Sequence, residues 1–232
     1  MIDIHCHILP GVDDGPADTE QALAMARTAV KDGITDIIAT PHISGAFQST
    51  EEIVRRTKEF NQALKQEGIP LTIYPGAELP SHYDLAVWGN YTINNGKYIL
   101  IEFPHSHFPS VGARLLEKGL NQTFWPIIAH PERNPGVIRN PTLLEPLIKM
   151  GVKIQITAES ILGTFGPAIQ QCAHYLLRRG LVHFIATDGH PTFNRQPRLA
   201  AGLKIAEKIL GPGKGKPLVH TNPAAVLANR PI

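Results

Sequence analysis

Two histidines lie near the start of the chain, in the stretch DIHCHILPGVDDG. One residue separates His5 from His7, and two adjacent aspartates, Asp13 and Asp14, follow them. Successive side chains of a β-strand point to opposite faces, so both imidazoles would share one face and Cys6 would lie on the other. Imidazole and carboxylate groups together suit divalent metals such as manganese, iron or zinc. The stretch therefore predicts a metal site, although histidines at a barrel mouth are also found as plain polar residues.

Short runs rich in β-branched residues alternate with helical patterns along the chain. The predicted strands are residues 2–8, 35–42, 71–78, 97–104, 124–131, 152–160 and 181–190. The predicted helices are residues 17–33, 50–68, 111–122, 140–151, 166–180, 197–211 and 222–230. Such alternation is typical of a parallel sheet, and the lack of a G-x-G-x-x-G turn favours a closed barrel. We therefore expect an α/β fold in which seven strands form one barrel, with a single domain over residues 1–232.

Glycines mark the ends of several predicted helices. A helix commonly stops where the backbone becomes left-handed, a conformation that glycine adopts most easily. The glycines at such positions are Gly33, Gly68, Gly151 and Gly180. The stretch that follows Glu78, through Trp88 and Tyr91, is predicted as a longer loop or a small hairpin.

Further candidate ligands fall at the carboxyl ends of the later strands. In a parallel barrel these ends meet at one rim, so side chains far apart in sequence become neighbours. The residues that fall there are His42, Glu78, Glu102, His130, Asp188 and His190, which join His5 and His7 of the first strand. Gathering so many polar groups at one rim is unfavourable unless they are paired or coordinated. The joint pattern predicts a site for two or three metal ions.

The remaining histidines are interpreted as structural. His105 and His107 form a second H-x-H pair, but Pro104 and Pro109 enclose it, which indicates a loop. Four others have no carboxylate partner nearby in sequence and are predicted to be packed or surface residues: His82, His174, His183 and His220.

The two cysteines are predicted to be free thiols. Cys172 and Arg178 have the C-x5-R spacing of thiol-based phosphatases. The segment between them has a helical, apolar pattern without the glycines that turn backbone N–H groups toward a phosphate. We therefore interpret this spacing as chance and Cys6 as a packing residue.

Charge and hydropathy exclude several classes of function. The net charge is +2 and basic residues form no long block, so nothing predicts a nucleic-acid partner. Apolar residues make up 43% of the chain and charged residues 18%, which is typical of a globular protein with a substantial core. No apolar run of transmembrane length occurs, and the first residues do not resemble a signal peptide. We expect no membrane insertion and a cytoplasmic location.

Several motifs resemble those of one known family. MIDIHCHILPGVDDGP, ATPH, GAE, IEFP, AHPER, TDGH and NPAAVL are similar to segments of the PHP-superfamily protein-tyrosine phosphatases encoded with bacterial capsule and exopolysaccharide genes, the CpsB/CapC type. The likeness extends from Met1 to about Asn229, and the combination of HCHILPGVDDG with HPER is specific to this branch. The resemblance implies a distorted (β/α)7 barrel of the PHP fold, which forms one metallophosphoesterase domain.

The resemblance also implies three divalent ions, most often manganese, with iron and zinc as alternatives. The first ion would be bound by His5, His7, Glu78 and Asp188, the second by Glu78, Glu102 and His130, and the third by Asp14, His42 and His190. Asp14, and not Asp13, is the implied ligand. Arg133 of HPER and Arg195 match two arginines that such enzymes direct at the phosphate, and these two with Asp188 form the implied catalytic set.

Charge supports a phosphate as the substrate group. Three ions would bring roughly six positive charges, and four carboxylates with one hydroxide would remove about five, which leaves a positive site beside two arginines. A metal-bridged hydroxide would attack phosphorus while the arginines neutralise the phosphate oxygens. A tyrosine leaving group has a pKa of about 10, so it needs little acid assistance and aryl phosphates would be favoured.

The predicted function is a metal-dependent protein-tyrosine phosphatase. Its expected substrate is phosphotyrosine on the tail of a bacterial tyrosine autokinase that controls capsule or exopolysaccharide synthesis. One alternative is another PHP phosphoesterase, such as a histidinol-phosphate phosphatase or an exonuclease. A metal-dependent amidohydrolase would usually need a lysine at a strand end, which the chain lacks. A further alternative is a regulatory module that binds a phosphorylated kinase tail without cleaving it. The sequence indicates no oligomeric state.

Overall fold

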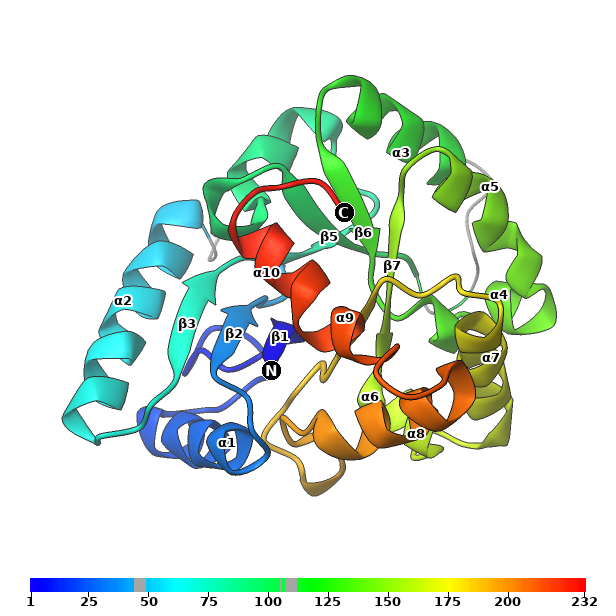
Figure 1. The fold of residues 1–232 in the computed structure, drawn as a ribbon. Coiled ribbons are helices and arrows are strands. Elements are labelled where there is room, and N and C mark those ends of the chain that lie inside the picture. The colour runs from blue at the N-terminus through cyan, green and yellow to red at the C-terminus, as the bar shows by residue number, and fades with distance from the viewer. Residues whose placement is uncertain (44–48, 105, 107–111) are drawn as a thin grey trace.

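The fold is built around parallel strands that are surrounded by helices (Figure 1). The computed structural model describes residues 1–43, 49–104, 106 and 112–232. The strands within these ranges are β1 (Ile2–Cys6), β2 (Asp36–Ala39), β3 (Thr72–Pro75), β4 (Glu78–Pro80), β5 (Tyr98–Glu102), β6 (Trp125–Ile128), β7 (Lys153–Thr157) and β8 (Phe184–Ala186). All pair in parallel, in the orders β1-β2-β3 and β4-β5-β6-β7-β8.

Short bridges join these two sheets on both sides. Just beyond β2, His42 pairs with Glu78 of β4, and Cys6 of β1 pairs with Gly189 just beyond β8. The backbone N–H of His7 donates to the Gly189 carbonyl at 2.9 Å, which strengthens the second bridge. The strands therefore form one closed α/β barrel, as the alternation of strands and helices predicts.

The predicted third strand, residues 71–78, is divided in two. Its first part, β3, pairs with β2, and its second part, β4, pairs with β5. The chain bends at Gly76, where an added Cβ would lie 2.8 Å from Cγ2 of Ile38. Only glycine allows this close approach to β2. The eight described strands thus correspond to the seven predicted ones, because the predicted third strand is present as β3 and β4.

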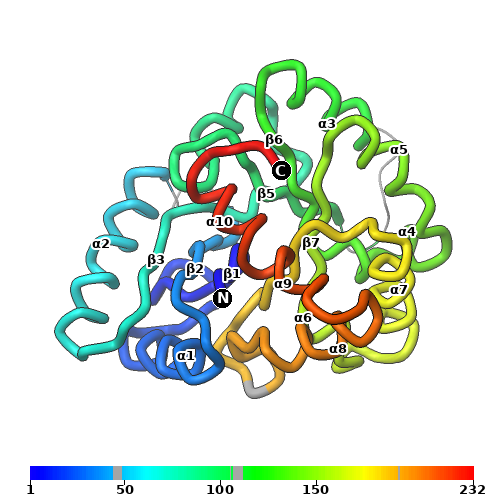
Figure 2. Tube along the Cα trace, viewed as in Figure 1, coloured from blue at the N-terminus to red at the C-terminus, as the bar shows by residue number. Residues whose placement is uncertain are grey.

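The helices α1 to α8 lie around the strands, and α9 and α10 follow along the chain (Figure 2). Their bounds are α1 (Thr19–Lys31), α2 (Thr50–Gln66), α3 (Gly112–Asn121), α4 (Pro135–Arg139), α5 (Leu144–Lys149), α6 (Ala158–Leu162), α7 (Pro167–Arg178), α8 (Ala200–Leu210), α9 (Lys216–Val219) and α10 (Thr221–Leu227). The four glycines predicted to have positive φ angles all have them, between 64° and 111°. No helix within the described ranges is long and apolar enough to cross a membrane.

Several local predictions need correction. The stretch after β4 is not a hairpin, because it forms two 3-10 helices, η2 (Leu85–Tyr91) and η3 (Ile93–Asn95). The strand predicted over 152–160 ends at Thr157, whose side chain accepts a hydrogen bond from the Ser160 backbone N–H and starts α6. An N-cap of this kind favours a helix over a longer strand. Further 3-10 turns are η4 (Pro131–Arg133), η5 (Pro141–Leu143) and η6 (Phe193–Arg195).

Alternate strand residues form two apolar layers. Ile38, Leu100 and Phe184 belong to an inner cluster within the barrel, which Val226 of α10 joins. Their strand neighbours, such as Ile37, pack against the outer helices. This two-residue alternation is what a barrel wall with two buried faces requires. The inner cluster and α10 fill the barrel at the amino-terminal end of the strands, and the opposite end is polar.

Candidate metal centre

The nine predicted metal ligands come together at the carboxyl-terminal end of the strands. Their donor atoms form four groups. Within each group, all donor atoms lie within 4.8 Å of one another, so each group could hold an ion. These groups are His5, His7 and Glu78; His5, His130 and Asp188; His42, Glu78 and Glu102; and His7, Asp14, His42 and His190. Glu78 differs from the prediction in one respect, because it begins β4 and does not end a strand. Every predicted ligand belongs to at least one group.

The central group has the geometry of a metal site. Nε2 of His5 lies 3.3 Å from Nε2 of His7, and both nitrogens lie 3.3 to 3.4 Å from Oε2 of Glu78. Oδ1 of Asp188 lies 3.5 and 3.2 Å from the same nitrogens. Four ligands placed tetrahedrally about 2.1 Å from an ion would be roughly 3.4 Å apart. Each of the two carboxylate oxygens therefore lies at a distance from the two imidazole nitrogens that suits ligands of one divalent ion.

Glu78 supports the same interpretation from a different observation. Its Oε2 atom is fully buried and accepts no well-formed hydrogen bond within the described structure. Three ring nitrogens nevertheless surround this oxygen at 3.0 to 3.4 Å. A buried carboxylate oxygen without a donor is unfavourable unless a cation is present. The other oxygen, Oε1, lies 2.8 Å from Nε2 of His130, so the carboxylate extends toward two groups of ligands.

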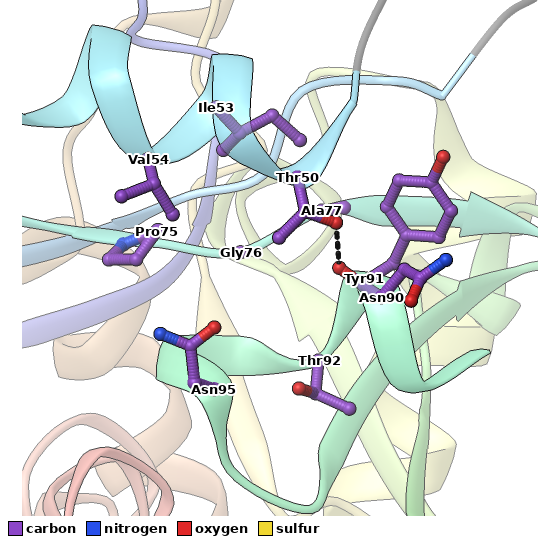
Figure 3. Close-up of a pocket in the computed structure, with 10 residues that line it drawn as sticks. All are labelled: Thr50, Ile53, Val54, Pro75, Gly76, Ala77, Asn90, Tyr91, Thr92 and Asn95. Carbon is purple, nitrogen blue, oxygen red and sulfur yellow. Dashed lines mark hydrogen bonds between the residues drawn. The ribbon is translucent and has the colours of Figure 1, made fainter. Parts of the chain in front are cut away.

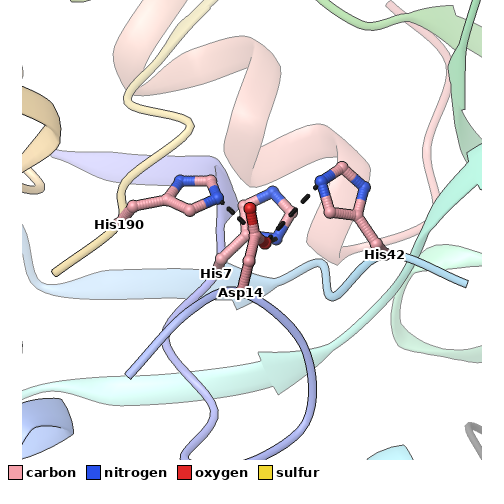
Figure 4. A group of neighbouring side chains, drawn as sticks. All are labelled: His7, Asp14, His42 and His190. Carbon is pink, nitrogen blue, oxygen red and sulfur yellow. Dashed lines mark hydrogen bonds and ion pairs between the residues drawn. The ribbon is translucent and has the colours of Figure 1, made fainter. Parts of the chain in front are cut away.

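Three histidines surround Asp14 in a further group (Figure 4). Oδ1 of Asp14 lies 3.2 Å from Nε2 of His190 and 3.8 Å from Nε2 of His42. Nδ1 of His42 also lies 3.0 Å from Oε2 of Glu78, which brings His42 close to the central group. Asp14 comes from an exposed loop, with a side-chain exposure of 60%. This group is therefore open to solvent at Asp14.

Outer hydrogen bonds orient the histidine rings. Nδ1 of His7 donates to Oδ2 of Asp13 at 2.6 Å, and Nδ1 of His5 donates to Oε1 of Gln155 at 3.1 Å. With a proton on Nδ1, the Nε2 lone pair is available to a metal. Asp13 thus orients His7, whereas Asp14 belongs to one of the four groups that could hold an ion. Sequence reasoning missed Gln155, although a polar residue between Ile154 and Ile156 was a usable signal.

Electrostatic interactions keep the carboxylates ionised. Burial would raise the pKa of Asp188, but His5, His7 and Arg133 hold it well below its ordinary value. Burial also opposes ionisation of Glu78, yet the surrounding histidines lower its pKa well below the usual range. Burial, with the positive charge of neighbouring groups, lowers the pKa of His190 to about 4. The site therefore offers anionic carboxylates and a neutral imidazole, both of which favour cation binding.

Both predicted arginines contact the same carboxylate. Nη1 of Arg133 lies 2.5 Å and Nη2 of Arg195 lies 2.6 Å from Oδ2 of Asp188. The other oxygen of Asp188 faces the histidines. One carboxylate thus connects the ligand cluster to two guanidinium groups. Guanidinium groups bind phosphate through paired hydrogen bonds, so an anion could bind beside the cluster.

The other described histidines and the two cysteines belong to none of the four ligand groups. His82, His174, His183 and His220 belong to no metal-binding group within the described ranges, as predicted. His105 and His107 lie outside the described residues. Both cysteines are free, as predicted, and both are buried. Burial, with the nearby negative charge of Glu132, raises the pKa of Cys172 to about 12, which leaves no thiolate for nucleophilic attack near neutral pH.

A small pocket elsewhere on the barrel has no such chemistry. It lies between α2 and the segment that contains η2 and η3 (Figure 3). The Thr50 hydroxyl donates a hydrogen bond to the Asn90 carbonyl at this place. The residues that line the pocket are all uncharged: Thr50, Ile53, Val54, Pro75, Gly76, Ala77, Asn90, Tyr91, Thr92 and Asn95. None of the nine predicted ligands contributes to it.

The chain matches a known family along nearly its full length. Residues 1–228 match the family model described as capsular polysaccharide synthesis, CpsB/CapC. The chain belongs to the CpsB/CapC family. It is 40% identical over 217 residues to tyrosine-protein phosphatase YwqE of Bacillus subtilis (strain 168). The aligned region covers 91% of this chain and 85% of the relative. It is 31% identical over 250 residues to tyrosine-protein phosphatase CpsB of Streptococcus pneumoniae, with full coverage of both chains.

A solved structure of the same family has the same fold. It comes from the work on YwqE from Bacillus subtilis and CpsB from Streptococcus pneumoniae, described as unique metal-dependent tyrosine phosphatases. The TM-score is 0.94 with 36% sequence identity, over 100% of this chain and 96% of that chain. The family resemblance and the α/β barrel predicted for this CpsB/CapC protein are therefore confirmed.

Proposed function

We propose that this protein is a metal-dependent protein-tyrosine phosphatase. The observation that carries the proposal is the position of Asp188, whose two oxygens face a histidine cluster on one side and two arginines on the other. A metal cluster beside guanidinium groups suits a phosphate monoester. The family relatives are named tyrosine-protein phosphatases, which supports tyrosine as the leaving group.

The ligands would be shared among three ions. His5, His7, Glu78 and Asp188 would hold the first, Glu78, Glu102 and His130 the second, and Asp14, His42 and His190 the third. Manganese is the proposed metal, with iron and zinc as alternatives, because the donors are imidazoles and carboxylates without a thiolate. When bound, such ions supply Lewis acidity to the phosphate and make a water more acidic.

The two arginines would bind and orient the phosphate. Arg133 and Arg195 keep most of their guanidinium donors after their single contacts with Asp188, since each guanidinium carries five. A phosphate in reach of both would receive charge-assisted hydrogen bonds on its non-bridging oxygens. Arg195 is the more exposed, at 29% against 12% for Arg133. We therefore assign Arg195 to the entry side and Arg133 to the inner side of the site.

Two central carboxylates of the cluster offer no proton to a leaving group. Glu78 and Asp188 have pKa values held well below the usual range, so neither carries a proton to donate near neutral pH. A tyrosine phenolate, with a pKa of about 10, leaves without strong protonation, whereas a serine alkoxide does not. Phosphotyrosine should therefore react faster than phosphoserine.

The proposed substrate is a phosphotyrosine on a bacterial tyrosine autokinase tail in the cytoplasm. The family description, capsular polysaccharide synthesis, supports a role in capsule or exopolysaccharide production. A reducing compartment also suits the two buried free thiols.

A steady-state assay tests the proposed function. Manganese-loaded protein is offered p-nitrophenyl phosphate, phosphotyrosine and phosphoserine peptides, and histidinol phosphate, with a chelator and His5→Ala as controls. The proposal expects the phosphotyrosine peptide to be the best natural substrate and both controls to be inactive. Preference for histidinol phosphate would favour the alternative phosphatase, and tight binding without turnover would favour a regulatory module.

A further inference from the structure

Two neighbouring residues of the AHPER segment contact different parts of the barrel. Arg133 extends to Asp188 at the cluster, as described above. Glu132 is fully buried and faces the end of β7, where its Oε1 accepts a hydrogen bond from the Thr157 backbone N–H at 3.0 Å. The contact with Asp188 links Arg133 to the ligand cluster. Glu132 belongs to none of the four ligand groups, so the cluster does not account for its burial.

Thr157 connects Glu132 to Arg133. Its hydroxyl lies 3.2 Å from Oε1 of Glu132 and accepts a hydrogen bond from Nη2 of Arg133 at 3.1 Å. Ser160 also contacts this hydroxyl, with its backbone N–H at 3.2 Å and its own hydroxyl oxygen at 2.7 Å. Thr157 itself is fully buried. The side chain of Thr157 is therefore the meeting point of an inner acid and the phosphate-site arginine.

The Thr157 hydroxyl can donate one hydrogen bond, and its partner decides which groups it accepts from. A threonine hydroxyl has one proton to donate and two lone pairs to accept with. When Glu132 receives that proton, one lone pair accepts from Arg133, and the other is shared by the backbone N–H and the hydroxyl of Ser160. A chain in which each bond polarises the next is stronger than its separate members. Glu132 thus orients Thr157 as an acceptor toward the guanidinium.

Arg133 is thereby held on three sides. Its Nη1 atom contacts Asp188 at 2.5 Å, its Nη2 atom contacts Thr157 at 3.1 Å, and its guanidinium carbon lies 4.3 Å from the ring centroid of Phe165. Two fixed N–H groups and a stacked ring define both the position and the plane of a guanidinium. Such fixing matters because a displaced phosphate-binding group loses much of its effect on the reaction.

We propose that Thr157, oriented by the buried Glu132, is a positioning residue that holds the Arg133 guanidinium in the plane required for phosphate binding. This inference rests on the proposed function for its relevance to turnover. The placement of Arg133 can also be tested by binding of inorganic phosphate alone.

Thr157→Val and Thr157→Ser test the proposal in the full-length, manganese-loaded protein. Valine keeps the shape and removes the acceptor, so phosphate affinity should fall about tenfold, the value of one hydrogen bond to a charged group. Serine keeps the hydroxyl and should stay within about threefold of the parent protein. Thr57→Val is the control for loss of a buried hydroxyl, since its hydroxyl donates to the Ile53 carbonyl within α2. The free energy of unfolding is measured in both variants, because Thr157→Val also removes the N-cap of α6. Equal losses in Thr57→Val and Thr157→Val would overturn the proposal.

A double-mutant cycle with Arg133→Ala separates positioning from general damage. Phosphate affinity is measured by calorimetry, and bound manganese is quantified in every variant. Thr157→Val should weaken binding in the parent protein but add less than about twofold in the Arg133→Ala background. Additive losses, or loss of manganese in Thr157→Val, would contradict a role through Arg133.

Glu132→Gln tests the inner end of the chain of hydrogen bonds. It should weaken phosphate binding by about threefold in the parent protein and add nothing when residue 157 is valine. An additive loss would show that Glu132 acts by another route. If phosphate binding follows these expectations while phosphotyrosine is not hydrolysed, the positioning inference stands and the proposed function fails.

Discussion

The two ends of the barrel are made by the same strands but by opposite kinds of residue. At the amino-terminal end, apolar side chains such as Ile4 and Phe184 pack with Val226 of α10. At the carboxyl-terminal end, histidines and carboxylates crowd together, and two of these residues, His130 and Asp188, have left-handed backbones with φ of 30° and 50°. Left-handed conformations are costly for residues other than glycine. The amino-terminal end therefore stabilises the fold, whereas the carboxyl-terminal end forms the site at a cost in stability.

This comparison predicts that substitutions at the two ends will affect different properties. At the polar end, activity should fall far more than stability, because burying these polar groups is itself unfavourable and their arrangement serves the site. At the apolar end, stability should fall while activity persists.

The largest expected effect comes from Asp188→Asn. This change keeps the shape of the side chain but removes the charge that faces both the histidines and the arginines. The kcat/KM for a phosphotyrosine peptide should fall roughly 1000-fold or more, as expected when a central electrostatic contact of an active site is lost. Steady-state kinetics with saturating manganese measures it, and the melting temperature serves as the control for folding. A loss of less than tenfold would contradict the central place given to this residue.

Replacing the arginines should have the next largest effect. Arg133→Ala and Arg195→Ala should each lower kcat/KM by about 100-fold, since each removes a charge-assisted contact with the phosphate. Lysine at either position should recover part of the loss because it restores charge without the paired geometry. Manganese content is measured in parallel and should not change. Normal kinetics in either alanine variant would remove that arginine from the phosphate site.

Val226→Ala tests the opposite end of the barrel. The side chain is buried in the inner cluster, so its truncation should lower the free energy of unfolding by about 2 kcal/mol. Urea denaturation measures the loss, and kcat/KM at 25 °C should stay within about twofold of the parent value. If activity fell as far as in the arginine variants, the separation between the two ends would not hold.

The smallest effect is expected from Cys172→Ser. The thiol is buried in α7, and burial raises its pKa to about 12, so it does not serve as a nucleophile. Phosphatase activity should therefore remain within about twofold of the parent protein. An inactive but folded variant, judged by circular dichroism, would restore the thiol mechanism that the C-x5-R spacing suggests.

Residues at strand ends were predictable because the strand pattern alone places them. His5 and His7 follow the two-residue period, and His130 lies at the end of the strand predicted over 124–131, which is present as β6 (Trp125–Ile128). Parallel strands bring their carboxyl ends to one rim whatever the details of the loops. The gathering of the ligands could thus be inferred without coordinates, while their assignment to separate ions stays a prediction.

Contacts across the barrel could not be predicted in the same way. The hydrogen bond from His5 to Gln155 joins residues 150 positions apart, and the bond from Arg133 to Thr157 depends on where β7 ends. The strand break at Gly76 arises from its approach to Ile38, which only the folded barrel defines. Asn134, which follows HPER, caps α4 and donates to the Pro104 carbonyl. Local patterns identify such residues only when their partners are close in sequence.

A metal titration decides whether these nine side chains hold the ions needed for turnover. Protein stripped of metal is titrated with manganese while bound metal and hydrolysis of a phosphotyrosine peptide are followed together, and the loaded protein is crystallised to locate the ions by anomalous scattering. We predict no turnover without metal, a rise that follows occupancy, and every ion within the cluster. Full turnover in the stripped protein, or ions bound away from the nine residues, would contradict the account.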